Sequence, residues 1–217
     1  MQKPMRAYHF TNKAYGIEDL EKRRLKIARI EELNDPFELL APRFPHESAR
    51  AIWQAYRTAI HNTLGVICFN CEWNNPVHWS HYADKHRGIC LGFDVSTSSC
   101  FEVKYDDERL DVSLPDPMPT EPQELWNLIF PLMTTKYIGW SYERERRMMV
   151  FIGQSIHDQG HYFQAFRDIM TLKEVTIGVK CDLRPENVRN SLGNMQVGVQ
   201  VYQATLSLNT YQIERHQ

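Results

Sequence analysis

Residues 75–95 read NPVHWSHYADKHRGICLGFDV and carry the clearest structural signal in the chain. Asn75 is a typical helix N-cap, and Pro76 suits the first helical position because the N–H that proline lacks needs no partner there. The pattern predicts a helix that continues to about Arg87. Gly88 suits the left-handed position just beyond the end of such a helix.

A mostly apolar run follows and predicts a central strand over Ile89–Val95. Local periodicity predicts further helices over Ile17–Arg24, Glu47–Asn62, Glu124–Met133 and Pro185–Leu192. It predicts further strands over Arg6–Phe10, Leu25–Ile30, Gly65–Phe69, Phe101–Tyr105 (as the hairpin partner of Ile89–Val95), Arg146–Ile152 and Lys173–Val179, with a closing hairpin of Val197–Leu206 and Tyr211–Glu214. Residues 111–122 are rich in proline and are predicted to be a loop. We therefore expect one α+β domain over residues 1–217, with 111–122 as an internal insertion.

The composition is that of an ordinary globular protein, with 42% hydrophobic and 24% charged residues among 217. The formal net charge of -2 gives no overall basic field for nucleic acid, although Arg144, Arg146 and Arg147 form a local basic strip. No run approaches the roughly 20 apolar residues that span a bilayer, and residues 1–6 show no signal-peptide pattern. The five cysteines lie in scattered, apolar surroundings typical of reduced thiols. We therefore expect a cytoplasmic protein with no membrane partner.

The charged residues after Trp140 include the strongest catalytic candidates. Glu143, Glu145 and Arg147 are spaced two apart, so all three share one face if the strand begins this early. Two carboxylates about 6–7 Å apart on one face raise one pKa, and Arg147 offsets part of that repulsion. Such a pair can bind a ribose hydroxyl and polarise a nucleophile, and an aromatic such as Trp140 suits a ring-binding pocket. The alternative is an exposed edge strand of alternating charge.

Two further segments offer groups that can contact a ligand. His9 and Thr11 share one face of the first predicted strand, with Phe10 on the other, and can donate and accept toward vicinal hydroxyls or an amide. The alternative is a histidine bonded at the sheet edge. Tyr82 can stack on a flat ring or donate its hydroxyl, whereas Trp79 packs the helix onto the sheet.

The segment from Asn34 to Glu38 reads NDPFE and has the composition of a turn. Asp35 can cap the turn that Pro36 opens. Turn chemistry does not explain Glu38, which either anchors the loop to an arginine or faces a ligand.

The alternative is a zinc site, because Cys68, Cys71, His78 and His81 supply four ligands of kinds that zinc accepts. The gap before His78 is shorter than in a zinc finger, and the apolar neighbours of Cys68 favour a buried, inert thiol. We therefore expect no metal.

Four of these blocks together resemble a large bacterial family of uncharacterised proteins. The motifs are Tyr-His-Tyr/Phe-Thr, Asn-Asp-Pro-Phe-Glu, a Trp-x-x-Tyr-Ala helix followed by a glycine-containing apolar strand, and a late Trp-x-x-Glu-x-Glu-x-Arg. They run in this order from Tyr8 to Phe151. That family in turn distantly resembles the ADP-ribosyltransferases.

The resemblance implies a fold and a site. The fold is a split, bent, mostly antiparallel sheet flanked by helices. In the histidine–tyrosine–glutamate class of these enzymes, a His-x-Thr strand contacts NAD, an aromatic helix stacks the nicotinamide and a late strand supplies the catalytic glutamate. Glu145 matches this glutamate, with Glu143 as the rival. The implied NAD-binding residues are His9, Thr11, Tyr82, Asn34, Trp140 and Arg147. Phe10 stands where poly-ADP-ribose polymerases have glycine.

The resemblance therefore implies transfer of ADP-ribose from NAD to a macromolecular acceptor, a protein or a nucleic acid, as in toxins and phage-defence effectors. NAD is then a substrate, and no metal is required. With water as the acceptor, the same site is that of an NAD glycohydrolase. The alternative from another class is a non-catalytic module that binds nucleic acid or protein.

Overall fold

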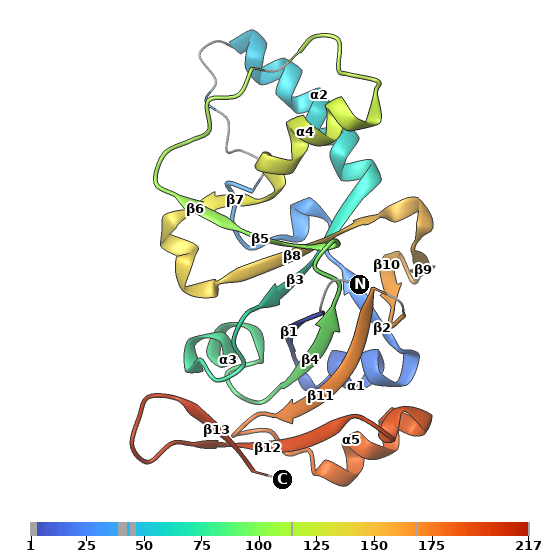
Figure 1. Ribbon diagram of the computed structural model, residues 1–217, viewed down its shortest axis with the longest axis vertical. Coiled ribbons are helices and arrows are strands. Elements are labelled where there is room, and N and C mark those ends of the chain that lie inside the picture. Colours follow the sequence, from blue (N-terminus) through green and yellow to red (C-terminus); the bar gives the residue numbers. More distant parts are fainter. Residues whose placement is uncertain (1–3, 39–42, 44–46, 114, 168, 217) are drawn as a thin grey trace.

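The computed structural model describes residues 4–38, 43, 47–113, 115–167 and 169–216, and a curled sheet forms its centre (Figure 1). Within these residues the sheet has eight strands in the order β13-β12-β11-β4-β1-β3-β8-β5. Neighbouring strands are antiparallel except for β11 and β12. The strands are β1 (Met5–Thr11), β3 (Leu64–Asn70), β4 (Ile89–Val95), β5 (Cys100–Glu102), β8 (Glu145–Phe151), β11 (Met170–Ile177), β12 (Gln200–Leu206) and β13 (Ile213–His216). These elements confirm the prediction of a mixed α and β chain with a mostly antiparallel sheet.

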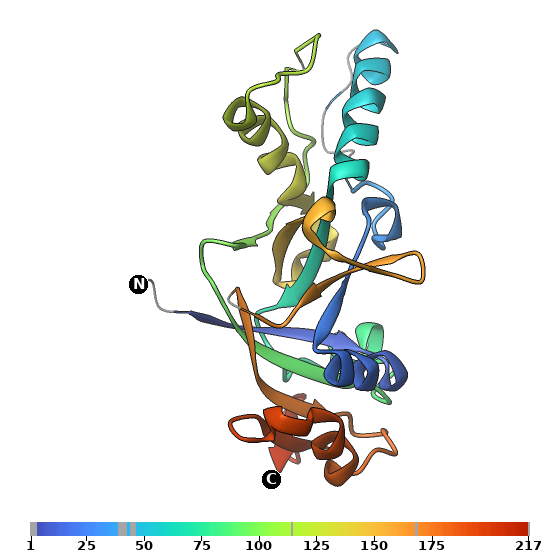
Figure 2. The ribbon, with the colours of Figure 1, turned by 90° about the vertical axis from the view of Figure 1, so that its right-hand side faces the viewer.

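The sheet opens between β1 and β3. Strand β1 pairs with β4 along its whole length, from Met5↔Val95 to Thr11↔Ile89. With β3 it shares a single register pair, Tyr8↔Asn70. The two halves therefore diverge on either side of this pair, and Figure 2 shows the resulting bend from the side. A continuous ladder between β1 and β3 would cover the backbone and side chains at this point. Because the ladder is missing there, these groups can line a cavity.

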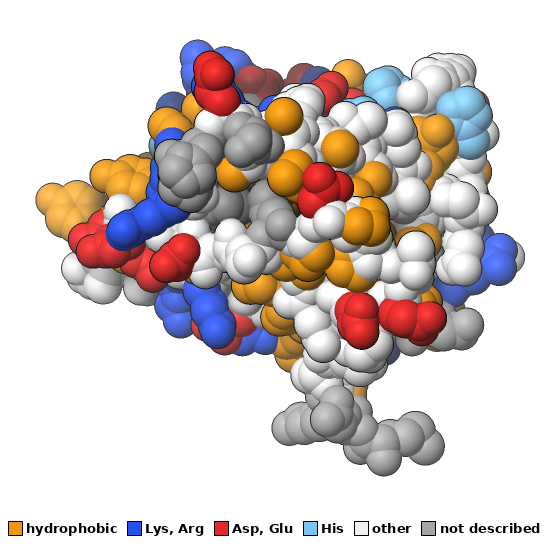
Figure 3. Space-filling view, turned by 90° about the horizontal axis from the view of Figure 1, so that it is seen from above, with side chains coloured by type: hydrophobic (Ala, Val, Ile, Leu, Met, Phe, Trp, Pro, Cys, Tyr) orange, Lys and Arg blue, Asp and Glu red, His pale blue; other side chains and the backbone are white. Residues whose placement is uncertain are grey.

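Helices cover the two ends of the sheet. At one end, α2 (Glu47–Thr63) and α4 (Pro122–Met133) lie near each other, and their residues share a core cluster centred on Trp53, Tyr56 and Leu132. Figure 3 views the molecule from above and shows apolar side chains on this surface among polar ones. At the other end, α1 (Lys13–Lys22) packs near α5 (Pro185–Leu192), and Leu20, Val188 and Leu192 join the main core.

Helix α3 (Pro76–Tyr82) begins as predicted but ends earlier. The Asn75 side chain accepts a hydrogen bond from the Val77 N–H at 2.9 Å, which satisfies an amide left free at the helix start. The helix ends at Tyr82, and the next turn places residues 84, 85 and 86 at φ of 45°, 54° and 71°. The predicted end near Arg87 is therefore wrong, because the left-handed turn comes several residues before the glycine.

Gly88 has a different role from the predicted one. Its φ is not positive; instead, a Cβ at this position would lie 2.0 Å from the backbone oxygen of Thr11. The missing side chain lets the chain that enters β4 approach the end of β1. This close approach allows the Thr11↔Ile89 pair to start the β1–β4 ladder.

Other predicted elements need correction. Residues 101–105 are not a hairpin partner of β4: β5 pairs with β8, and β6 (Lys104–Asp106) pairs in parallel with β7 (Thr135–Tyr137). Helix α1 begins at Lys13 rather than Ile17, because Asn12 caps it through the Tyr15 N–H. Strand β2 (Arg24–Ile27) is shorter than predicted and joins β10 (His161–Ala165) and β9 (Ile156–Asp158) in a small sheet.

The remaining predictions agree with the structure within a few residues at their ends. This holds for α2, α4, α5, β11 and the β12–β13 hairpin. Among residues 111–122, those that the structure describes form a loop up to Pro122, where α4 begins. None of the described helices is long and apolar enough to cross a bilayer.

We expect Gly88→Ala to destabilise the protein by about 3 kcal/mol, since its Cβ meets backbone that cannot move aside without breaking the ladder. The matched control is Gly153→Ala, because a Cβ at Gly153 has no atom within 4 Å. Urea denaturation of both variants measures the difference. Equal stability of the two variants would contradict the close-packing role.

Candidate active site

A cavity of about 220 Å³ lies at the opening of the sheet. Its walls come from β1, β3 and the start of β8, together with the loop before α2 and the end of α3. We call it the central cavity. The polar side chains that decide its chemistry are His9, Asn34, Tyr82, Lys136, Glu143 and Glu145.

A buried ionic cluster forms one side of the central cavity. Glu38, Glu143 and Glu145 face Lys136 and Arg147, and each of the five side chains is at most 5% exposed. Three carboxylates against two cations leave a formal charge of minus one. Such a site favours a ligand that carries or develops positive charge.

Arg147 lies at the centre of the cluster. Its guanidinium donates to both oxygens of Glu38, and to Glu145 at 2.8 Å from Nε and 3.0 Å from Nη2. It also donates to the Met133 backbone oxygen at 2.9 Å. Every nitrogen of Arg147 is therefore engaged by Glu38, Glu145 or the Met133 carbonyl, and the predicted contact of this residue with NAD stays a prediction. Glu38 anchors its loop to an arginine, which is one of the two predicted alternatives, and it also lines the cavity.

Glu145 shares the inward face of β8 with Arg147, as the period-two pattern predicts, while Arg146 points outward. Burial opposes ionisation of Glu145, but Arg147 and then Lys136 outweigh it and hold the pKa of this carboxyl at about 2. The prediction that one of the paired acids has a raised pKa is therefore not met at Glu145. The reason is that two cations, not one, neutralise the pair.

Glu143 reaches the cavity by another route. It lies in the 3-10 helix η2 (Ile138–Glu143), and Arg144 with φ of 46° turns the chain before β8 begins. Glu143 is thus not on the strand face predicted for it. Asn70 fixes its backbone by donating to the Glu143 carbonyl at 2.8 Å.

The Glu143 carboxylate is held by three donors. Lys136 Nζ lies 2.7 Å from Oε2, and Oε1 accepts from the Tyr82 hydroxyl and from Asn34 Nδ2 at 3.4 Å. Burial and then the bond to Glu143 raise the pKa of Tyr82, so the phenol stays protonated as a donor. Both Asn34 and Tyr82, from blocks far apart in the sequence, therefore orient one carboxylate.

His9 stands across the sheet opening from this carboxylate group. Its Nδ1 is 3.0 Å from the Cys68 backbone oxygen, and its ring packs edge-on against Phe69. A carbonyl only accepts, so Nδ1 carries the proton. Burial lowers the pKa of His9, which makes the ring neutral near pH 7. The neutral tautomer leaves Nε2 as a hydrogen-bond acceptor.

Thr11 lines a different depression from His9. This shallow groove of about 590 Å³ adjoins the central cavity, and Phe10 and Tyr82 border both. Lys13 and Asp84 also line the groove. The two residues of the His-x-Thr pattern thus face neighbouring parts of one continuous surface rather than a single pocket.

Trp140 does not line the central cavity, but its ring lies 4.7 Å from Lys136 Nζ. Lys136 itself is missing from the sequence-based set, because a single lysine among threonines and a tyrosine has no recognisable signal. Its importance comes from burial and from three carboxylates that distant segments supply.

The residues of the alternative zinc site have separate partners. His78 bonds through Nε2 to the Tyr142 backbone oxygen at 2.9 Å, and Cys71 accepts from Arg146 Nε at 3.1 Å. Burial raises the pKa of the Cys68 thiol well above its usual range. Among the residues that the structure describes, no group of three or more His, Cys, Asp or Glu side chains is placed to hold a metal ion.

Comparison of the chain with models of known families, with curated proteins and with solved structures finds no match.

The ionic cluster predicts a specific dependence of stability on pH. Because the pKa of Glu145 falls from 4.5 in the unfolded chain to about 2 on folding, its stabilisation is complete above pH 4.5 and is lost as the pH falls through 2. We expect Glu145→Gln to cost about 3 kcal/mol at pH 7 and almost nothing at pH 2. Denaturant titrations across this range measure the difference.

Glu102→Gln is the matched control, since this carboxylate is 75% exposed and its ion pair with Arg146 is long, at 3.9 Å. We expect it to change the free energy of unfolding by less than about 0.5 kcal/mol at every pH. A Glu145→Gln penalty that does not shrink in acid would show that the carboxylate acts through packing and not through charge.

Proposed function

We propose that this protein binds NAD and transfers its ADP-ribose group to a macromolecular acceptor. The observation that carries the proposal is the convergence of His9 from β1, Tyr82 from α3 and Glu143 from η2 on the central cavity. These residues belong to three of the sequence blocks that resemble the ADP-ribosyltransferases. The opening between β1 and β3 also fits the split sheet that the resemblance implies.

The dimensions of the site support binding of NAD in two parts. At about 220 Å³, the central cavity is smaller than the roughly 300–1,000 Å³ typical of pockets for drug-sized ligands. It therefore suits the nicotinamide and its ribose. The adjoining groove lies at the start of α1 and suits the diphosphate, because helix N-termini favour negative charge; the Lys13 ammonium in this groove is paired with Asp182 at 2.7 Å and would have to leave it to contact the ligand.

Glu143 is the better candidate for contact with the reacting ribose. Arg147 holds both oxygens of Glu145 through its charged guanidinium, whereas Oε1 of Glu143 is bonded only by the neutral donors Tyr82 and Asn34, which a ribose hydroxyl can replace more easily. We therefore assign Glu143 as the catalytic carboxylate and Glu145 as a positioning residue. This reverses the order of preference that the resemblance implies.

The proposed reaction is a substitution at C1′ of the nicotinamide ribose. The bond from C1′ to the nicotinamide nitrogen breaks and its electron pair leaves with nicotinamide. Glu143 accepts a hydrogen bond from a ribose hydroxyl and stabilises the positive charge that develops on the sugar. A nucleophile of the acceptor then bonds to C1′ and loses its proton to solvent. His9 Nε2 accepts from a second hydroxyl and orients the dinucleotide.

We expect Glu143→Gln to reduce nicotinamide release from NAD by about 10²–10⁴-fold, as for other positioned carboxylates, with NAD affinity within about threefold of wild type. The assay incubates adenylate-labelled NAD with a bacterial lysate and measures the released nicotinamide by chromatography, while the label follows the ADP-ribose. Glu102→Gln, far more exposed and outside the cavity, should keep full activity.

The fate of the label separates the related activities. Label on macromolecules supports transfer, and label in free ADP-ribose identifies an NAD glycohydrolase that uses the same site. Full nicotinamide release by Glu143→Gln would refute the assignment of the catalytic residue.

We also expect His9→Ala to weaken NAD binding about tenfold, since it removes one hydrogen bond to the ligand. Calorimetric titration of the wild type and the variant gives the two affinities. If the wild type shows no saturable binding at millimolar NAD, the enzymatic proposal fails and a non-catalytic binding module becomes the better description.

A further inference from the structure

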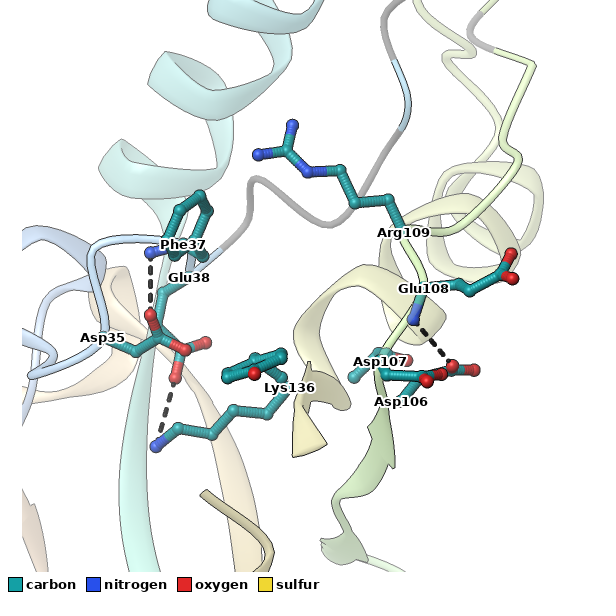
Figure 4. Close-up of a pocket in the computed structure, with 10 residues that line it drawn as sticks. Asp35, Phe37, Glu38, Asp106, Asp107, Glu108, Arg109 and Lys136 are labelled. Carbon is teal, nitrogen blue, oxygen red and sulfur yellow. Dashed lines mark hydrogen bonds and ion pairs between the residues drawn. The ribbon is translucent and has the colours of Figure 1, made fainter. Parts of the chain in front are cut away.

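A second cavity, of about 330 Å³, lies on the other side of Glu38 and Lys136, and these two residues line both cavities. We call it the acidic pocket and define it by Asp35, Phe37, Asp106, Asp107, Arg109 and Tyr137. Figure 4 shows Asp35 and Phe37 on one side, residues 106–109 on the other and Lys136 between them. One turn contributes to both cavities: Asn34 and Glu38 line the central cavity, and Asp35 and Phe37 line the acidic pocket.

The pocket has an excess of negative charge after its internal pairs are counted. Glu38 is neutralised by Arg147, the lining cation Lys136 by Glu143 of the central cavity, and Glu108 by Arg43. Among the described residues, three lining carboxylates have no cationic partner: Asp35, Asp106 and Asp107. One lining cation, Arg109, has no carboxylate partner within the same part of the chain. Three carboxylates against one guanidinium leave a formal charge of minus two for a ligand to neutralise.

Two aromatic rings give the pocket flat walls. Phe37 is 53% exposed and Tyr137 is 55% exposed, although both line a concave site. The guanidinium carbon of Arg109 lies 5.4 Å from the centroid of the Phe37 ring, within cation–π range. The pocket thus already holds one guanidinium of the chain itself against an aromatic wall.

Asp35 is held in the wall of this pocket. The residue is 4% exposed, and its Oδ1 accepts a hydrogen bond from the Phe37 N–H at 2.9 Å. One turn therefore fixes a carboxylate beside the Phe37 ring.

We propose that the acidic pocket binds the guanidinium of an arginine side chain presented by a partner protein. A guanidinium is planar, stacks on aromatic rings and offers several N–H donors, which matches two ring walls with carboxylates around them. The ammonium of lysine is a compact, strongly hydrated charge that uses the rings less well. The binding involves no bond making and does not depend on the proposed transferase activity.

The test is calorimetric titration of the full chain, without NAD, with the capped tripeptide acetyl-Gly-Arg-Gly-amide at low ionic strength. The same tripeptides with lysine or glutamine at the centre serve as comparators. We expect saturable binding of the arginine peptide, at least about fivefold weaker binding of the lysine peptide, and no binding of the glutamine peptide.

Three variants are expected to change the affinity for the arginine peptide in different ways. Asp107→Asn removes an exposed carboxylate of the pocket and should weaken arginine binding about fivefold to tenfold. Arg109→Gln removes the internal guanidinium that competes for the Phe37 ring and should strengthen binding by a few-fold. Glu102→Gln, exposed but outside the pocket, should leave the affinity unchanged.

Opposite changes for Asp107→Asn and Arg109→Gln are not expected from a general loss of stability, and melting curves of both variants confirm that they fold. The proposal fails if the arginine peptide shows no saturation, or if all three variants bind it alike. Equal affinity for arginine and lysine would overturn the assignment of a guanidinium. NAD binding at the central cavity is measured separately, so either proposal can fail alone.

Discussion

The Arg147 guanidinium, clamped between Glu38 and Glu145, is the interaction on which the rest of the site depends. It ties together the turn before α2, the start of β8 and, through the Met133 carbonyl, the end of α4. Removing charges from water costs several kcal/mol per ion, so a buried cluster contributes little net stability even when it is well paired. Its main effect is on geometry. Any arrangement of these segments that separates the partners leaves an uncompensated buried charge and is therefore strongly disfavoured.

Lys136 extends this clamp into the two cavities. One ammonium lies 2.7 Å from Glu143, 3.4 Å from Glu145 and 3.6 Å from Glu38, so three carboxylates from separate segments share it. The wall between the central cavity and the acidic pocket is therefore ionic and not apolar. A hydrophobic wall would separate the cavities equally well, but it would not orient Glu143 toward one of them.

Sequence patterns predicted those features that depend on neighbouring residues. The Asn75 cap, the strand Ile89–Val95 and the alternation of Glu145, Arg146 and Arg147 follow from local geometry alone. The role of Gly88 was misread because its cause is the Thr11 carbonyl, which only the fold brings near. The pairing of residues 100–102 was misread for the same reason, since β8 lies far along the chain. Lys136 carried no signal because its importance arises from burial.

The shared wall of Glu38 and Lys136 has a thermodynamic consequence. Any ligand that shifts these two side chains from one cavity alters the electrostatic environment of the other. Linkage then requires reciprocity: the factor by which a first ligand changes the affinity for a second equals the factor by which the second changes the affinity for the first. Two ligands bound on either side of this ionic wall would therefore be coupled. The coupling is favourable if both ligands favour the same position of the Lys136 ammonium and unfavourable if they do not.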